Sequence, residues 1–306
     1  MSIISLKEIK EILPQRYPML MLDRAEKQSD TKYAGVKNVT INENVFNGHF
    51  PGHSIVPGVL QIEAMKQLAQ LAVANKLDPK SENDIYMRVV EKVKFRKPNN
   101  PGDRMLVEAE VLEIENGEAI VTCKITNNSG LSCQAKITLA VRPKVQPKRM
   151  PKMFTEFDKH AETPSDVHEI MKRIPHRYPF LLIDNIVKYG EDGTTICAIK
   201  NVSQNEEIFA NCPDDYAVLP TSLQCEISAQ SGCVSVLANP ENKGKLGYFM
   251  SIDRAEVLAP VFPGDQIVCN MFVHPGSSRF GRGYGTISVD GEVVFKIELM
   301  FAIVDP

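Results

Sequence analysis

The sequence predicts an α+β protein made of two tandem copies of one unit, each a curved antiparallel sheet wrapped around a central helix. Three observations lead to this prediction. Four sequence blocks occur twice in the same order, each copy contains one helix that is apolar on most sides, and segments with alternating apolar residues follow that helix. At 306 residues, each half is long enough to bury its own core.

The duplication is visible at a nearly constant offset. Arg16 matches Arg177 (177 − 16 = 161), and Lys37 matches Lys200 (200 − 37 = 163). Blocks that keep their order and register in this way indicate one unit present twice. The matched blocks are ILPQRYPMLMLDR (12–24) with RIPHRYPFLLIDN (173–185), KNVTINENVF (37–46) with KNVSQNEEIF (200–209), PGVLQIEAMKQLAQLAV (from 57) with PTSLQCEISAQSGCVSV (from 220), and KPNNPGDRMLVEAEV (from 97) with APVFPGDQIVCNMFV (from 259).

A basic, proline-rich segment separates the copies. RPKVQPKRMPK, from Arg142 to Lys152, has three prolines, five basic residues and no acidic one. Proline removes backbone donors and disfavours helix, so we expect a surface linker. The predicted domains are 1–141 and 163–306, with 142–162 between them.

Each copy is predicted to begin with a short helix, followed by a strand (MLMLDR or FLLIDN), a turn and a second strand. The next loop ends at Pro57 or Pro220, and a helix follows because proline is favoured at a first helical turn. The helix after Pro57 is apolar around most of its circumference, which is typical of a buried helix. Segments such as RMLVEAEVLEI and QIVCNMFVHP then have the period of two that antiparallel strands show.

The composition excludes several classes of protein. A net charge of −3 and a hydrophobic share of 43% give no global signal for binding nucleic acid or an anionic membrane. No charge-free stretch approaches the length of a membrane span, and MSIISLKEIKEILP has the pattern of an amphipathic helix, not of a secretory signal. Seven scattered cysteines without C-x-x-C spacing favour a reducing cytosol over disulfides or structural zinc.

The sharpest local feature is GHFPGHSIVPGVLQIEAMKQ, at 48–67. It places His49 in a loop and Glu63 in the helix that follows, 63 − 49 = 14 residues later. In the second copy, the offset of 163 brings Cys212 to the position of His49 and Glu226 to that of Glu63. Each glutamate lies in a mainly apolar helix, where an unpaired charge would be costly, so neither is expected to be an ordinary surface carboxylate.

This segment resembles the active-site segment of FabZ-type 3-hydroxyacyl-acyl carrier protein dehydratases. HRYPFLLID, KNVTINE, EKVKFRKP and both PGD triplets are also similar to that family, and the resemblance covers nearly all of both copies. It implies two tandem hot-dog domains packed as a pseudo-dimer. It also implies that each site takes its histidine from one unit and its glutamate from the other, so His49 pairs with Glu226 and Cys212 with Glu63.

The resemblance therefore implies one complete site and one degenerate site. Elimination of water from a 3-hydroxyacyl thioester needs a base for the C2 proton and an acid for the departing C3 hydroxyl. We expect His49 to be the base, because neutral imidazole is available at cellular pH. We expect Glu226 to be the acid, because burial in an apolar tunnel disfavours its ionised form. The Gly58 N–H, at the start of its helix, is the expected oxyanion donor, and no metal or organic cofactor is expected.

The degenerate site leaves alternatives open. Cys212 could act as a nucleophile toward a thioester, but Asp214 and Asp215 beside it would raise the pKa of its thiol, so simple degeneration is favoured. Glu63 is either vestigial, structural or a partner of His53.

Other residues resemble the family's binding features. A basic patch like the one that meets the acidic carrier protein is formed by Lys92, Lys94, Arg96 and Lys97. A solvated strand edge is the alternative. The second copy retains only Arg254 there, so carrier docking is expected on one side. Tyr86 and Tyr248 precede this strand at equivalent positions, either as gates of an acyl tunnel or as core residues.

The predicted function is dehydration of 3-hydroxyacyl-acyl carrier protein to the trans-2-enoyl form, in cytoplasmic fatty acid or related acyl-chain synthesis, and the resemblance implies the (3R) substrate. The predicted partner is acyl carrier protein, with neither nucleic acid nor membrane insertion. One alternative is a hydratase of CoA thioesters, and another is a non-catalytic, thioester-binding partner subunit. A trimer of such chains would reproduce the hexamer common in the family.

Overall fold

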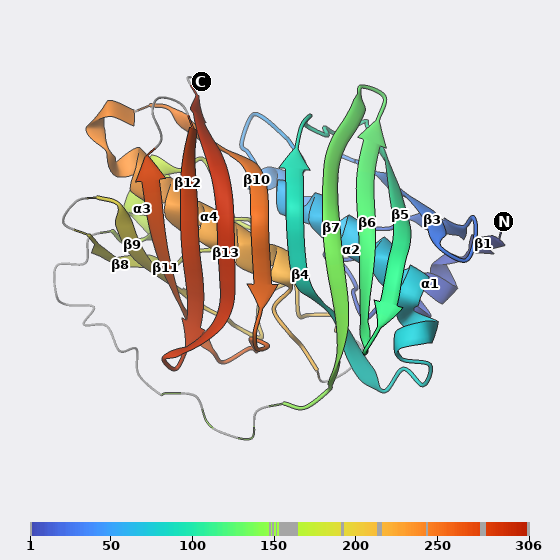
Figure 1. The fold of residues 1–306 in the computed structure, drawn as a ribbon. Coiled ribbons are helices and arrows are strands. Elements are labelled where there is room, and N and C mark those ends of the chain that lie inside the picture. Colours follow the sequence, from blue (N-terminus) through green and yellow to red (C-terminus); the bar gives the residue numbers. More distant parts are fainter. Residues whose placement is uncertain are drawn as a thin grey trace. The chain divides into compact units, whose positions relative to one another are not determined.

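A computed structural model of the chain describes residues 2–146, 148, 150, 152, 165–190, 193–212, 216–242, 244–275 and 280–304. They form two compact units (Figure 1). The first unit contains Met1–Phe46, Ser54–Gln146 and Asn205–Ala217, and the second contains Asn47–His53, Pro147–Gln204 and Val218–Pro306. Each unit thus includes one short segment that the sequence repeat assigns to the other copy.

The first unit is an antiparallel sheet packed against one long helix, α2 (Gly58–Leu77). Its strands are hydrogen-bonded in the order β1-β2-β3-β5-β6-β7-β4, and the short helix α1 (Leu6–Ile12) also contacts α2. A 3-10 turn, η1, spans Asn44–Asn47. The strands are β1 (Ser2–Ile4), β2 (Arg24–Lys27), β3 (Lys32–Asn38), β4 (Asn83–Phe95), β5 (Arg104–Glu115), β6 (Glu118–Asn127) and β7 (Gly130–Pro143).

The second unit repeats this plan around helix α4 (Thr221–Ala238), which contacts α3 (Val167–Arg173). Its strand order β8-β9-β11-β12-β13-β10 reproduces β2-β3-β5-β6-β7-β4 of the first unit. The predicted α+β fold of two tandem sheet-and-helix units is therefore confirmed. The remaining elements are β8 (Asn185–Tyr189), β9 (Thr195–Asn201), η2 (Pro240–Asn242), β10 (Leu246–Val257), β11 (Gln266–Pro275), β12 (Phe280–Val289) and β13 (Glu292–Val304).

The two long helices are core elements, as their apolar composition predicts. Every residue of α2 from Val59 to Ala74 is buried. Both helices also bury polar side chains. Among them are Glu63 in α2 and Glu226 in α4, whose exposed fractions are only 2% and 5%. Because a buried carboxyl needs hydrogen-bond partners, these two positions must be matched by polar groups in the surrounding structure.

The strands predicted at MLMLDR (19–24) and FLLIDN (180–185) are wrong, since β2 begins at Arg24 and β8 at Asn185. The Met21 N–H donates to Gln67 Oε1, and the Leu182 N–H donates to Gln230 Oε1, both at 2.9 Å. The middle of each segment therefore bonds to a side chain of the central helix, and only its end reaches a strand, where the Asp23 N–H donates to the Val36 carbonyl and the Asp184 N–H to the Ile199 carbonyl. Their apolar residues are buried on those helices, which gives them the composition of a strand without its pairing.

The predicted linker begins later than expected. β7 extends to Pro143, and the Arg142 guanidinium forms an ion pair of 2.7 Å with Asp84 at the start of β4. Arg142 therefore belongs to a strand, and most of the remaining predicted linker lies outside the described residues.

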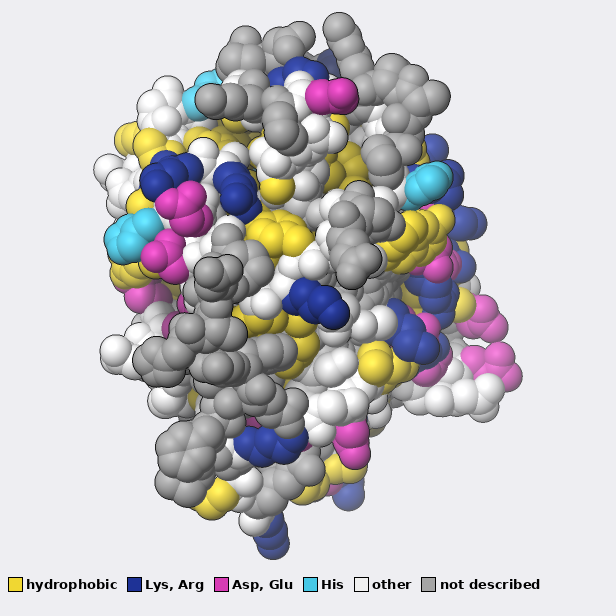
Figure 2. All heavy atoms as spheres, turned by 90° about the vertical axis from the view of Figure 1, so that its left-hand side faces the viewer, with side chains coloured by type: hydrophobic (Ala, Val, Ile, Leu, Met, Phe, Trp, Pro, Cys, Tyr) yellow, Lys and Arg dark blue, Asp and Glu magenta, His cyan; other side chains and the backbone are white. Residues whose placement is uncertain are grey.

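The described surface carries mixed charge. On the face shown in Figure 2, Lys and Arg side chains lie among Asp, Glu and hydrophobic ones, in keeping with the net charge of −3. In the part of the chain that the structure describes, no helix is both long and apolar enough to cross a membrane. All seven cysteines are free thiols.

Candidate active site in the second unit

The His49 loop, Asn47–His53, folds as part of the second unit. The Arg177 N–H donates to the Gly48 carbonyl at 3.0 Å, and a Cβ added to Gly48 would lie 2.1 Å from the Arg177 carbonyl oxygen. Backbone hydrogen bonds between Phe50 and His53, at 3.0 and 2.9 Å, close the loop. Only glycine allows this close approach, so Gly48 sets the position of the neighbouring histidine.

We expect Gly48→Ala to lower kcat by about 100-fold, because the new methyl group must push the His49 loop away from Arg177 and a displacement of about 1 Å is enough for such a loss. The matched control is Gly232→Ala in α4, where an added Cβ meets side-chain atoms only at 3.6 and 3.7 Å. Steady-state kinetics with thermal unfolding of both variants provides the measurement. Equal activity of the two variants would contradict the assigned loop position.

His49 is half-buried among three other rings. Its ring centroid is 3.9 Å from that of Phe50, 5.5 Å from that of Phe180 and 5.6 Å from that of His176. Phe180 and His176 both come from the HRYPFLLID block of the second copy. The structure therefore brings the histidine of the first copy against a segment of the second.

Glu226 of α4 joins this cluster. Its Oε1 atom lies 3.3 Å from His176 Nε2 and accepts a hydrogen bond of 2.9 Å from Gln230 Nε2. Gln230 also donates to the Phe180 carbonyl at 2.8 Å, so it links the helix to the loop that carries the aromatic rings. In the part of the chain that the structure describes, Glu226 Oε2 has no hydrogen-bond partner.

The pKa of Glu226 departs from the sequence prediction. Burial alone raises it, as expected, but the hydrogen bond and charge of His176 act in the opposite direction, together with the charge of His49 and the hydrogen bond from Gln230. The net result is a pKa below the ordinary value of the carboxyl. The predicted upward direction is therefore wrong, because the site supplies partners that stabilise the ionised form.

His176 is the site residue that the sequence prediction missed. The sequence did contain a signal. The matched blocks place His176 opposite Gln15, so the second copy has a titratable ring where the first copy has an amide. The imidazole is buried, with 9% of its side chain exposed. Periodicity gives no hint of its role, because the contact with Glu226 joins two elements that are distant in sequence.

The first unit keeps only part of this arrangement. Gln67 Nε2 donates to Glu63 Oε1 at 3.0 Å and to the Met19 carbonyl at 2.6 Å, matching the bonds of Gln230. Cys212, at the position of His49, lies in the first unit with Sγ 3.7 Å from the Tyr216 carbonyl. Asp214 and Asp215, invoked for the thiol pKa, lie outside the described residues.

Comparison with known proteins identifies the family. A FabA-like domain profile matches residues 13–132 and 174–298. The chain belongs to the FabA-like family. The 3-hydroxyacyl-(acyl-carrier-protein) dehydratase FabZ of Staphylococcus saprophyticus is 44% identical over 142 residues, which are 46% of this chain and 97% of that relative. FabZ of Anoxybacillus flavithermus is 42% identical over 138 residues, 45% of this chain and 96% of that relative.

Solved structures show the same fold along both copies. The dehydratase domain of RzxB from Pseudomonas fluorescens aligns with a TM-score of 0.60 at 15% identity, covering 93% of this chain and 98% of that one. A structure described as a putative oleoyl thioesterase from Lactobacillus plantarum aligns with a TM-score of 0.56 at 9% identity, covering 90% of this chain and 97% of that one. The fold of this FabA-like protein is therefore also found outside dehydratases, and its chemistry must be argued from its site.

The predicted oxyanion donor lies in the first unit of this FabA-like protein. Gly58 begins α2, and a Cβ at Gly58 would lie 2.8 Å from the Phe95 ring. Close packing therefore already explains this glycine, and its oxyanion role stays a prediction. Phe95 lies between Lys94 and Arg96, so the basic patch begins beside the start of α2.

The two tyrosines proposed as gates differ in their surroundings. The Arg142 guanidinium lies 4.1 Å from the Tyr86 ring centroid, and burial raises the pKa of Tyr86. Tyr248 is 37% exposed, and the β10 position that matches Asp84 holds Leu246, paired with Val304 in place of an arginine. Tyr86 is half-buried beneath Arg142, and a gating role for either tyrosine stays a prediction.

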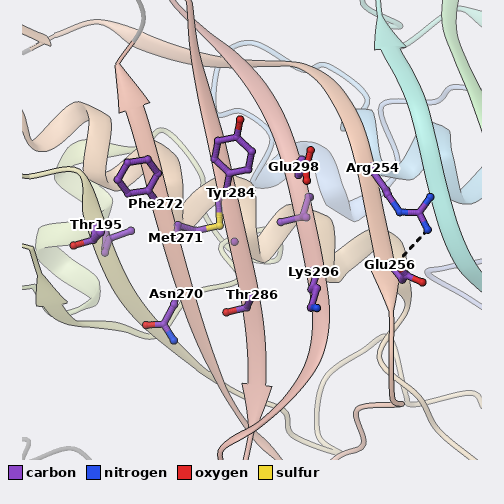
Figure 3. A pocket seen from close by; sticks show the side chains of 13 residues that line it. Thr195, Arg254, Glu256, Asn270, Met271, Phe272, Tyr284, Thr286, Lys296 and Glu298 are labelled. Atoms are coloured by element: carbon purple, nitrogen blue, oxygen red, sulfur yellow. Dashed lines mark hydrogen bonds and ion pairs between the residues drawn. The ribbon is translucent and has the colours of Figure 1, made fainter.

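A separate groove of 530 Å³ lies on the sheet of the second unit. Phe272 and Tyr284, paired across β11 and β12, are exposed there, while the preceding residue Met271 is buried and faces Gly232 of α4, so the groove opens on the face away from α4. Figure 3 shows these side chains in front of the strands, with the Arg254–Glu256 pair beside them. None of the active-site residues lines the groove, and we assign it no part in the reaction.

Proposed function

We propose that this FabA-like protein removes water from (3R)-3-hydroxyacyl groups carried by acyl carrier protein, giving trans-2-enoyl groups, at one site in the second unit. The observation that supports this site is the cluster formed by His49, His176 and the buried carboxyl of Glu226. The FabZ relatives are named as dehydratases of this substrate, which supports the reaction class.

In the proposed reaction, His49 takes the C2 proton and Glu226 gives a proton to the C3 hydroxyl. The C3–O bond breaks as the C2–C3 double bond forms, and water leaves. The thioester oxygen gains negative charge as the C2 proton leaves, and a backbone N–H at the start of a helix is the kind of donor that stabilises such charge. The resemblance to the family is the support for giving this role to the Gly58 N–H. A carboxyl with a lowered pKa is a stronger acid, so it gives up its proton readily, although fewer molecules hold that proton at neutral pH.

The test uses purified protein and matched thioesters. We expect interconversion of 3-hydroxybutyryl and crotonyl groups on acyl carrier protein, followed by the absorbance of the conjugated enoyl thioester. Equal rates on CoA would favour a CoA hydratase, and no conversion on either carrier would favour a non-catalytic binding subunit.

The carrier protein is proposed to dock on the basic patch of the first unit. Lys92, Lys94, Arg96 and Lys97 are all exposed, and Arg96 and Lys97 are held by Gln134 and by the Ser129 carbonyl. Because carrier proteins are acidic, this surface would speed their encounter with the enzyme. The adjacent Phe95–Gly58 contact would place the docked carrier beside the start of α2.

We expect the double variant Lys94→Glu/Arg96→Glu to raise KM for the carrier-linked substrate about tenfold, because reversed charge repels an acidic partner, and to leave a short carrier-free thioester unaffected. Arg254→Glu, in the corresponding stretch of the second copy, is the control. The KM of the carrier-linked substrate as a function of salt concentration provides the measurement. An equal effect of both charge reversals would remove the argument for one-sided docking.

The setting of the reaction is proposed as cytoplasmic fatty acid or related acyl-chain synthesis. Seven free cysteines are compatible with a reducing compartment. A trimer of this chain is the assembly we propose, because the family resemblance implies a hexamer of single units, and light scattering of the purified chain tests it.

A further inference from the structure

The histidine that the reaction scheme leaves without a role is His176. It lies next to Glu226 and beside His49, with ring centroids of His49 and His176 5.6 Å apart and the Phe50 ring 4.9 Å away. Among the described residues, its Nδ1 atom is buried and has no hydrogen-bond partner. A histidine that served the fold alone would be expected to satisfy both ring nitrogens.

The contacts of Glu226 are uneven between its two oxygens. His176 Nε2 and Gln230 Nε2 both approach Oε1, at 3.3 and 2.9 Å, whereas Oε2 has no partner in the part of the chain that the structure describes. A protonated carboxyl accepts hydrogen bonds at its carbonyl oxygen and donates from its hydroxyl oxygen. Two donors on Oε1 therefore favour the proton on Oε2.

We propose that His176 is a positioning residue: together with Gln230 it fixes Oε1 as the acceptor and leaves Oε2 to deliver the proton to the departing hydroxyl. This inference rests on the proposed dehydration. The same two donors stabilise the carboxylate that remains after the proton has left, so they favour the transfer as well as the orientation. The open Nδ1 provides an acceptor for a hydroxyl of the substrate or for the water that is released.

The first copy shows what the site becomes without this ring. Gln15 stands in place of His176, and its Oε1 is buried and has no partner among the described residues. The bond from Gln67 to Glu63 is nevertheless kept. The first unit therefore lacks the positioning imidazole as well as the base, and His176→Gln introduces the residue that the first copy has at the matching position.

The test compares His176→Gln and His176→Phe with His168→Gln, an exposed histidine of α3, in the full chain. We expect His176→Phe to lower kcat about 100-fold with KM changed less than about threefold, since it misplaces the acid without removing substrate contacts. His176→Gln retains an N–H donor and should lose less. The control should match the wild type.

The pH profile separates positioning from a purely structural role. His176 lowers the pKa of Glu226, so its removal raises that pKa. A required acid loses its proton as the pH rises, hence the alkaline limb of the kcat profile should move to higher pH in His176→Phe. The inference is overturned if kcat is unchanged in both variants, or if kcat falls while the alkaline limb stays in place. If His176→Phe does not fold, the pH profile of His176→Gln decides the test.

A carbon NMR titration of the Glu226 carboxyl makes the test independent of turnover. If the chain does not dehydrate but the pKa of Glu226 is higher in the His176 variants, the contact between His176 and Glu226 stands and the proposed function is refuted. An unchanged titration in an active chain would refute the positioning role alone.

Discussion

His49→Ala is expected to lower kcat by about 10²- to 10⁴-fold, the usual range for removal of a general base. The imidazole is half-buried against Phe50 and Phe180, and its charge acts on Glu226, so it is placed to exchange a proton in the site. Initial rates on a 3-hydroxyacyl thioester, with circular dichroism to confirm folding, provide the measurement.

The control for His49→Ala is His53→Ala in the same loop. His53 is exposed, and its backbone alone closes the turn with Phe50. The substitution should therefore leave kcat within about twofold, as for most surface changes. If His53→Ala stops the reaction and His49→Ala does not, the assigned base is the wrong histidine of the loop.

Glu226→Gln is expected to lower kcat by a similar factor, about 10²- to 10⁴-fold. The amide can keep the contacts of the buried carboxyl with His176 and Gln230, so the fold should persist, but it cannot donate an acidic proton. The pH profile of kcat in this variant should lack the alkaline limb that the Glu226 carboxyl produces in the wild type, and rates measured at several pH values test this.

Glu63→Gln is the matched control for Glu226→Gln, since Glu63 is equally buried and has the same bond from a glutamine one turn along the helix. With Cys212 and Gln15 at the histidine positions, its loss should cost little activity. The opposite result, a dead Glu63→Gln and an active Glu226→Gln, would move the reaction to the other copy.

The sequence predicted the unit and its duplication well, because both depend on regular signals. Burial of α2 follows from its apolar composition, and the identical strand orders follow from the matched blocks. The strand predicted at 19–24 failed because its backbone bonds to Gln67, a side chain distant in sequence. Local patterns do not reveal such a partner.

The candidate site was predicted in part. His49 and Glu226 come from different copies and lie in the same compact unit, while the direction of the Glu226 pKa depends on His176 and Gln230. Burial could be inferred from the helix, whereas the number of donors around the carboxyl required coordinates. His176 was quoted within a matched block, and comparison with Gln15 would have identified it as the distinctive residue.

The Asn47–His53 segment, encoded early in the chain, completes a centre whose acid is encoded late. A gene split between the copies would therefore leave neither product self-sufficient. Under the proposed reaction, a harmful change in either half would act on the same centre, so both halves would be needed for activity. Deleting one copy would then remove either the proposed base or the proposed acid, so a single copy could not take over the reaction.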